Sequence, residues 1–379
     1  MSFYAPLPPP RTKLGHYRIL SPSAGIRVSP IVLGASTIGD KWQDMMGATS
    51  KESSFKLLDA YYEAGGNFID TANAYQDEAS ESFIGEWMEL RGNRDQMVIA
   101  TKYTNFYKRG NDSINIKINY VGNHSKSLYV SVEESLKKLR TTYIDILYVH
   151  WWAWDTSVEE VMSALHHLVA SRKVLYLDAP AWVVSKANQW ARLSGKTPFS
   201  IYQGRWSILD RSFERDIIPM ARAEGLALAP FQVVGGGRIR TDEEEQRRRE
   251  TGEKGRMIMS SDWERTEDEK KVCKKLEEIA KEIGAKNITA VAIAYVMHKT
   301  AYVFPIIGGR KVEHLHANLE ALDITLTPEQ IKNLESVLPF DVGFPYVYIG
   351  HDTFGTNMLI SVAGRSDHWK PTPALPSAA

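Results

Sequence analysis

Four residues whose side chains can hold or exchange a proton follow three consecutive apolar runs of the sequence. Asp70 ends the run NFID, and Tyr75 follows it five residues later. Lys102 ends the run MVIATK, and His150 ends the run IDILYVH. Runs of this composition are typical of short parallel strands that are buried on both faces. Because the carboxyl ends of barrel strands lie at one face, we expect the four side chains to meet there.

A tyrosine beside a lysine is a suitable proton donor. An isolated phenol has a pKa of about 10, but a neighbouring ammonium favours the phenolate and lowers that pKa. Asp70 would keep Lys102 charged and oriented, and His150 would hydrogen-bond a substrate carbonyl. Tyr75 would then donate its proton as a hydride reaches the carbonyl carbon. Each residue alone has a plainer interpretation, such as a strand cap or a core histidine, but four at successive strand ends favour a shared site.

The chain alternates short apolar runs with amphipathic segments of helical spacing. This alternation predicts an α/β fold with crossover helices, and eight strands predict a closed (β/α)₈ TIM barrel. The expected strands lie at residues 31–37, 67–72, 97–102, 144–152, 174–180, 200–206, 226–231 and 303–309.

Further elements are expected outside the alternation. Residues 17–30 predict a hairpin that covers one end of the barrel, and 269–284 and 327–339 predict two extra helices. We expect one domain over 1–379, with a core from about 14 to 345 and flexible ends. Capping boxes are expected at Ser131 with Glu134, Thr156 with Glu159, and Thr327 with Gln330.

The composition gives no reason to expect nucleic acid or a membrane as a partner. Lys plus Arg and Asp plus Glu both number 46, and no apolar run approaches the ~20 residues that span a bilayer. The single cysteine, Cys273, suits a reducing compartment, and the opening residues lack the apolar core of a signal peptide. We therefore expect a cytoplasmic protein. HExxH and CxxC patterns are absent, so no metal site is expected.

Several segments resemble the aldo-keto reductases, with the closest likeness to the fungal aryl-alcohol dehydrogenase and norsolorinic acid reductase branch. The likeness extends from about residue 14 to about residue 345. The segments that carry it are 67–87, 92–103, 144–152, 211–225 and 304–322.

The resemblance implies an NADP(H)-dependent enzyme that interconverts a small carbonyl compound, aryl or polyketide-like, and its alcohol. It implies that Asp70, Tyr75, Lys102 and His150 are the catalytic tetrad, with Tyr75 as the proton donor. Trp151, Trp152 and Trp154 follow His150, and we expect His150 and Trp151 to contact substrate. An aromatic wall would suit an aryl substrate, whereas core packing is the alternative for at least one of the three.

The family also implies an extended NADPH, and no GxGxxG follows a strand here. Gln203 would bond the nicotinamide carboxamide, and Phe231 would pack near the nicotinamide ring. A loop containing Gly235, Gly237 and Arg238 would cross the pyrophosphate, since glycines let backbone N–H groups approach phosphate. A merely flexible loop is the alternative. The full set expected at the cofactor is Asp70, Asp178, Gln203, Phe231, Gly235, Gly237, Arg238, Arg310, His314 and Asn318.

Arg310 and Lys311 open a predicted helix, and cationic residues at a helix N-terminus favour an anion. By resemblance Arg310 would meet the 2′-phosphate of NADP, with His314 and Asn318 near the adenine. A solvated basic helix start is the alternative. The charged stretch 241–256 is expected to be a solvated helix or loop, and a lid over the cofactor is the alternative.

The fifth strand departs from the family pattern. Relatives end it with Gly-X-Ser-Asn or Gly-X-Ser-Asp, but here Leu177 is followed directly by Asp178. Asp178 would be the remnant of that pair. A protein that binds NADPH but is catalytically weakened or inactive is therefore the main alternative. A phosphate-utilising barrel isomerase is a weaker one, because it leaves the Asp–Tyr–Lys–His set unexplained.

Overall fold

The computed structural model describes residues 6–47, 49–252, 263–350, 358–365 and 371–375. Eight parallel strands form one sheet in the order β10-β3-β4-β5-β6-β7-β8-β9. They are β3 Val32–Gly34, β4 Phe68–Asp70, β5 Val98–Tyr103, β6 Ile144–Val149, β7 Val174–Asp178, β8 Ile201–Arg205, β9 Ala227–Phe231 and β10 Ile306–Ile307. Seven lie within the predicted runs, and β5 extends one residue beyond its run, to Tyr103.

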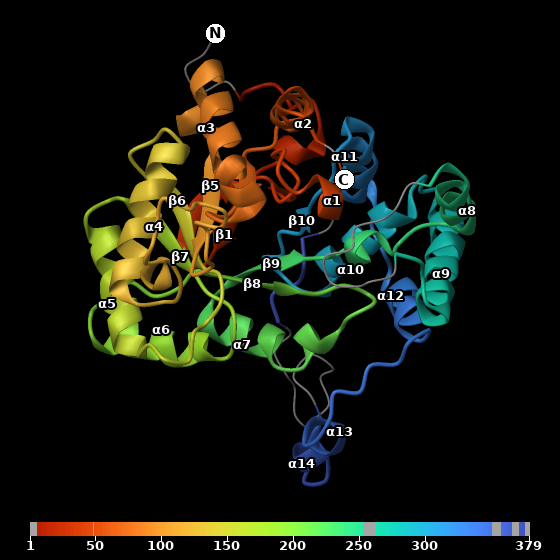
Figure 1. The fold of residues 1–379 in the computed structure, drawn as a ribbon. Helices are drawn as coiled ribbons and strands as arrows, with labels where there is room; N and C mark the ends of the chain where they lie inside the picture. Colours follow the sequence, from red (N-terminus) through yellow and green to blue (C-terminus); the bar gives the residue numbers. More distant parts are fainter. Residues whose placement is uncertain (1–5, 48, 253–262, 351–357, 366–370, 376–379) are drawn as a thin grey trace.

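The sheet closes on itself beside β9 and β10. Leu228 donates its backbone N–H to the carbonyl of Tyr302 over 2.9 Å, and Phe304 donates to the carbonyl of Leu228 over 2.8 Å. These bonds join the last strand to the segment that leads into β10, so the predicted barrel is confirmed (Figure 1).

Helices cover the outside of the barrel (Figure 1). They pack on it because both faces of a parallel sheet must be removed from water. The surrounding helices are α2 Lys51–Glu63, α3 Ala79–Arg91, α4 Ser125–Lys138, α5 Val158–Ala170, α6 Val183–Leu193, α7 Ile217–Glu224, α10 Ile288–Lys299 and α11 Val312–Leu319.

The predicted hairpin is formed by β1 Arg18–Ser21 and β2 Ala24–Val28, which pair antiparallel. Its Leu20, Ala24 and Val28 pack against residues near the starts of the strands, Val32 and Phe68 among them. The hairpin therefore covers the amino-terminal end of the barrel and leaves the carboxyl end for polar side chains.

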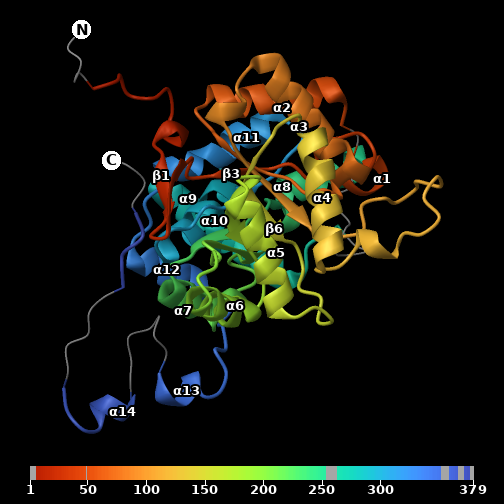
Figure 2. The ribbon, with the colours of Figure 1, turned by 90° about the vertical axis from the view of Figure 1, so that its left-hand side faces the viewer.

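Both predicted extra helices are present, as α9 Glu267–Ile283 and α12 Pro328–Glu335. The stretch 241–256, expected as a helix or loop, contains α8 Asp242–Thr251. The structure adds α1 Gln43–Met46, α13 Tyr346–Ile349 and α14 Met358–Ser361. Figures 1 and 2 show α13 and α14 apart from the barrel. Single 3₁₀ turns are η1 Lys13–Gly15, η2 Tyr75–Glu78, η3 Arg94–Gln96, η4 Ile118–Tyr120, η5 Ser212–Glu214, η6 Gly235–Gly237 and η7 Glu320–Asp323.

The capping predictions were only partly right. Thr327 forms the expected capping box with Gln330. Ser131 instead lies inside α4. That helix begins at Ser125, more than one turn earlier, and its N-cap is His124. The cap of α5 is Ser157 rather than Thr156, and it accepts from the N–H of Glu160. A Ser/Thr-x-x-Glu spacing also occurs inside helices, so the spacing alone does not fix where a helix begins.

The barrel interior changes from apolar to polar along its axis. Val32, Phe68 and Val98 belong to the apolar interior cluster. At the carboxyl end, Lys102 pairs in register with Tyr148, and Tyr148 with Asp178, so these side chains share one face. Within the part of the chain that the structure describes, we find no helix able to cross a membrane.

Candidate active site

Asp70 and Lys102 form a buried ion pair at the carboxyl ends of β4 and β5. The Lys102 Nζ donates to Asp70 Oδ1 over 2.5 Å and to the Thr71 carbonyl over 2.7 Å. Lys102 is only 1% exposed. Burial opposes the charged ammonium, but the charge of Asp70 and contacts with Asp70 and Tyr75 outweigh it and raise the pKa of Lys102. Lys102 is therefore a cation at neutral pH.

Tyr75 lies between this ammonium and the ring of His150. The Lys102 Nζ is 5.0 Å from the centre of the phenol ring, and the Tyr75 hydroxyl is a hydrogen-bond partner of Lys102. The Tyr75 and His150 ring centres are 6.0 Å apart, edge to face. Trp42 packs edge-on against Tyr75 at 6.2 Å. The structure thus brings together the four side chains that the sequence placed at strand ends.

His150 is a neutral hydrogen-bond donor in this arrangement. Burial, and then the charge of Lys102, lower the pKa of His150 well below its usual value. The Asn105 amide nitrogen lies 3.1 Å from His150 Nδ1. Because an amide nitrogen only donates, Nδ1 accepts and the ring proton is on Nε2. Asn105 was not predicted, since nothing in its neighbourhood in sequence shows that the loop after β5 returns to His150.

Tyr148 is a second unpredicted member of this region. It is 1% exposed, and Lys102 Nζ lies 5.2 Å from its ring centre. Burial, and then the charges of Asp70 and Asp178, raise the pKa of Tyr148 well above its usual value. Lys102 is therefore enclosed by two phenol rings, and the one on Tyr148 remains protonated.

Gln203 and Asp178 lie at the same end of the barrel but differ in their contacts. The Gln203 amide donates to Asp70 Oδ2 over 2.8 Å, which ties β8 to β4. Asp178 is fully buried, and neither of its carboxyl oxygens has a hydrogen-bond partner among the described residues. Burial raises the pKa of Asp178 well above its ordinary value. The shortened end of β7 thus places a carboxyl group of raised pKa in the barrel.

The expected glycine loop follows β9 and its last residue, Phe231. Gly235, Gly236 and Gly237 all have left-handed backbone angles, with φ of 61°, 64° and 95°. A Cβ at Gly236 or Gly237 would meet no atom within 4 Å, so the backbone there is open to a ligand. The guanidinium of Arg238 contacts Glu269 of α9 over 3.3 Å.

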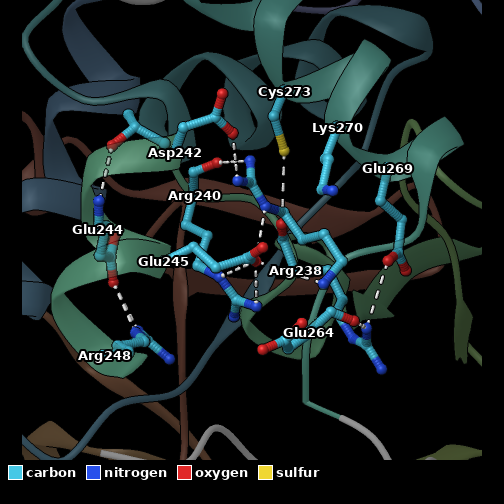
Figure 3. A network of polar contacts seen from close by, with 12 residues as sticks. Arg238, Arg240, Asp242, Glu244, Glu245, Arg248, Glu264, Glu269, Lys270 and Cys273 are labelled. Atoms are coloured by element: carbon cyan, nitrogen blue, oxygen red, sulfur yellow. Dashed lines mark hydrogen bonds and ion pairs between the residues drawn. The ribbon is translucent and has the colours of Figure 1, made fainter. Parts of the chain in front are cut away.

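A buried ionic cluster holds the residues after this loop (Figure 3). Glu245 of α8 accepts from Arg240 over 2.7 Å and from Arg265 over 2.9 Å. Burial alone would raise the pKa of Glu245, but these two guanidinium groups lower it to about 2. Arg240 and Arg265 also bond the carbonyls of Gly237 and Arg240, respectively.

The expectation that 241–256 is a solvated segment is therefore wrong for Glu245, which is 2% exposed. Its counter-charges come from residues 240 and 265, on either side of the charged stretch, so the stretch by itself did not reveal them. Residues 253–256 lie outside the described part of the chain.

Arg310, expected at the 2′-phosphate, lies just before α11, and His314 and Asn318, expected near the adenine, lie on that helix. Lys311 is the N-cap of this helix, and Arg310 precedes it. Arg310 packs against Gly47, where a Cβ would collide with its guanidinium group. His314 lies in the first turn beside Gly309, and Asn318 is buried further along. Arg310 thus joins the residue that follows α1 to the start of α11.

The tryptophans after His150 have different environments. Trp152 packs against the core, as expected for one of the three. Trp151 stacks on His150 at 5.3 Å and is 54% exposed. Trp154 stacks at 6.2 Å on Trp182, which follows β7, and both are mostly exposed. In the described residues no cluster of His, Cys, Asp and Glu could hold a metal ion.

The barrel and this set of side chains agree with what the sequence comparisons find. The model of the aldo/keto reductase family matches residues 30–339, and the chain belongs to that family. It is 60% identical to aryl-alcohol dehydrogenase [NADP(+)] of Phanerodontia chrysosporium, over 99% of each chain. It is 51% identical to an aldo-keto reductase of Aspergillus calidoustus, over 97% of this chain and 93% of the relative. It is 50% identical to norsolorinic acid reductase A of Aspergillus parasiticus, over 93% and 89%.

Proposed function

We propose that this protein is an NADP(H)-dependent oxidoreductase that interconverts an aldehyde or ketone and its alcohol. The observation that carries the proposal is the buried Lys102 ammonium, which contacts both the carboxylate of Asp70 and the hydroxyl of Tyr75. A phenol beside a permanent cation can give up its proton to a substrate oxygen. The printed names of the relatives support the same reaction class.

The site residues would divide the work as follows. Tyr75 donates its proton to the carbonyl oxygen, and Lys102 stabilises the phenolate that remains. Asp70 holds the ammonium in place, and the Nε2–H of His150 orients the carbonyl. The nicotinamide, when bound, supplies the hydride. In alcohol oxidation the same groups act in reverse, with Tyr75 taking the proton.

The described residues fit an NADP cofactor. Arg310 and Lys311 at the start of α11 would hold the 2′-phosphate, since cations and backbone N–H groups there attract an anion. The open backbone of Gly236 and Gly237, with Gly235 before them, would face the pyrophosphate. Gln203 would bond the carboxamide, with Phe231 near the ring, and His314 and Asn318 would lie by the adenine. A protonated Asp178 would donate to the carboxamide oxygen.

The aromatic residues around His150 favour an aryl or polycyclic substrate. Trp151 is stacked on His150, and the exposed pair of Trp154 and Trp182 lies on the loops after β6 and β7. Exposed large aromatic side chains at the mouth of a barrel provide flat apolar surface for a ring system. A carbonyl held by His150 would place an attached ring near Trp151.

The test is a steady-state assay of NADPH oxidation with benzaldehyde and with a two-ring aryl ketone, using NADPH that carries deuterium at both C4 positions. We expect turnover, with one deuterium on the carbinol carbon of the product. NADPH oxidation without an alcohol product, or product without the label, would exclude direct hydride transfer.

The unpartnered carboxyl of Asp178 favours a second candidate, an NADPH-binding protein with weakened or lost catalysis. In this case the nicotinamide would be poorly positioned although the rest of the cofactor is held. Tight NADPH binding by fluorescence, with no oxidation across aromatic and aliphatic carbonyl compounds, would establish this candidate over the first.

A further inference from the structure

The backbone directly after Tyr75 is strained. Gln76, Asp77 and Glu78 have φ of 54°, 48° and 79°, which is the left-handed region, and none of them is glycine. Each such residue costs about 1 kcal/mol or more. A turn of this kind persists only when its surroundings hold it, so the residues that do so also determine where Tyr75 lies.

Gln76 holds one side of the turn. Its side chain is 2% exposed and makes three hydrogen bonds to the loop before α1. The Oε1 atom accepts from the N–H groups of Lys41 over 3.0 Å and Trp42 over 2.9 Å, and Nε2 donates to the Ser36 carbonyl over 2.9 Å. The same Trp42 packs on Tyr75, so this loop supports both the turn and the ring.

Lys138 of α4 holds the other side. Its Nζ lies 3.1 Å from Glu78 in the turn and 2.8 Å from Glu81 in α3, and it donates to the Asn73 carbonyl over 3.2 Å. Asn73 and Glu78 flank Tyr75 in sequence, so one ammonium bridges the segment that carries the phenol. Glu78 is also paired with Lys108 over 3.0 Å.

This bridge is connected to the strand that carries Lys102. Glu81 is fully buried and accepts from the Thr101 hydroxyl over 2.5 Å. Thr101 precedes Lys102 in β5. Burial opposes a charge on Lys138, but Glu81 and Glu78 outweigh it and raise its pKa. Lys138, which holds the segment that carries Tyr75, is thus connected through Glu81 to β5, the strand that carries Lys102.

We propose that Lys138 is a positioning residue, which fixes Tyr75 against Lys102 by bridging Asn73, Glu78 and Glu81. The proposal rests on the proposed function, because it assigns how the proton donor is held. Reaction rates depend steeply on such placement, and a displacement of about 1 Å can lower a rate about a hundredfold.

The test compares Lys138→Met with Lys137→Met. Lys137 is the matched control, because it adjoins Lys138 in α4 but is 72% exposed, and among the described residues its ion pair is with Glu134 over 2.8 Å. For K138M we expect kcat for carbonyl reduction to fall about thirtyfold or more, with the Kd for NADPH unchanged. K137M should behave as wild type, and Lys138→Arg should restore part of kcat.

A wild-type kcat in folded K138M would overturn the proposal, as would equal losses in K138M and K137M. If K138M does not fold, Glu78→Gln removes one charge from the bridge and leaves the Lys138–Glu81 pair, and it should lower kcat in the same way. Crystal structures of wild type and variant separate this proposal from the proposed function. A Tyr75 hydroxyl displaced from Lys102 in the variant would support the positioning role even if no carbonyl compound is reduced, and an unmoved hydroxyl would contradict it.

Discussion

Lys102 and Asp178 lie at the same level of the barrel, because each is in register with Tyr148 on the strand between them. Lys102 has two hydrogen-bond acceptors within 2.7 Å, so it keeps its charge although it is buried. Asp178 has no side-chain donor of this kind, and burial raises its pKa well above the ordinary value. Both positions were identifiable from sequence as strand ends. Their protonation states were not, because they depend on which side chains of other strands reach them.

The state of Asp178 predicts an unusual dependence of stability on pH. Its folded pKa is raised, so the unfolded chain releases this proton first and the free energy of unfolding falls as pH rises above about 4. Asp178→Asn should remove this fall. Urea unfolding at pH 5 and pH 8 should show a larger gain of the variant over wild type at pH 8, by up to about 1.4 kcal/mol for each pH unit. A gain that is equal at both values would mean that Asp178 is ionised in the folded protein.

Asn105 and Gln203 show that the hydrogen-bond partners of uncharged residues are equally hard to predict from sequence. Gln203 was expected at the cofactor, and it does lie at the strand ends, where it bonds Asp70. Asn105 was missed although it determines the proton position on His150. An amide in a loop has no sequence pattern that reveals its partner, since the partner is set by the path of the loop.

At the scale of elements, Glu245 ties α8 to the segments that lead into α8 and α9. Removing its charge would leave Arg240 and Arg265 buried without their main counter-charge. We expect Glu245→Gln to lower the free energy of unfolding by about 3 kcal/mol, because a broken buried pair leaves uncompensated charge. Glu244→Gln is the control, since Glu244 is 36% exposed and its pair with Arg248 should contribute less than about 1 kcal/mol.

Urea unfolding at pH 7 measures both variants. The folded pKa of Glu245 is depressed, so its contribution should be complete above about pH 4.5 and decline toward pH 2. Equal, small effects of the two substitutions would show that α8 is not held by this cluster. The charge pattern of 241–256 predicted a solvated helix or loop and could not show that Glu245 is buried.

Across the whole molecule, the strand count was the most informative feature of the sequence. Eight apolar runs alternating with helical segments predicted a barrel, and closure then required the carboxyl ends of the strands to converge. This is why residues as far apart as Asp70 and Gln203 meet. The extra helices and the hairpin were also predictable from periodicity. The left-handed turn after Tyr75 was not, because its residues, Gln76 to Glu78, are poor candidates for that backbone by type alone.

The proposed reaction depends on Tyr75 transferring a proton while the cofactor is held by other residues. The most direct test measures the single-turnover rate of an aryl aldehyde and the Kd for NADPH in Tyr75→Phe. We predict that the rate falls at least about a hundredfold while the Kd changes less than about twofold. A Tyr75→Phe variant that reduces the aldehyde at the wild-type rate would show that Tyr75 is not the proton donor.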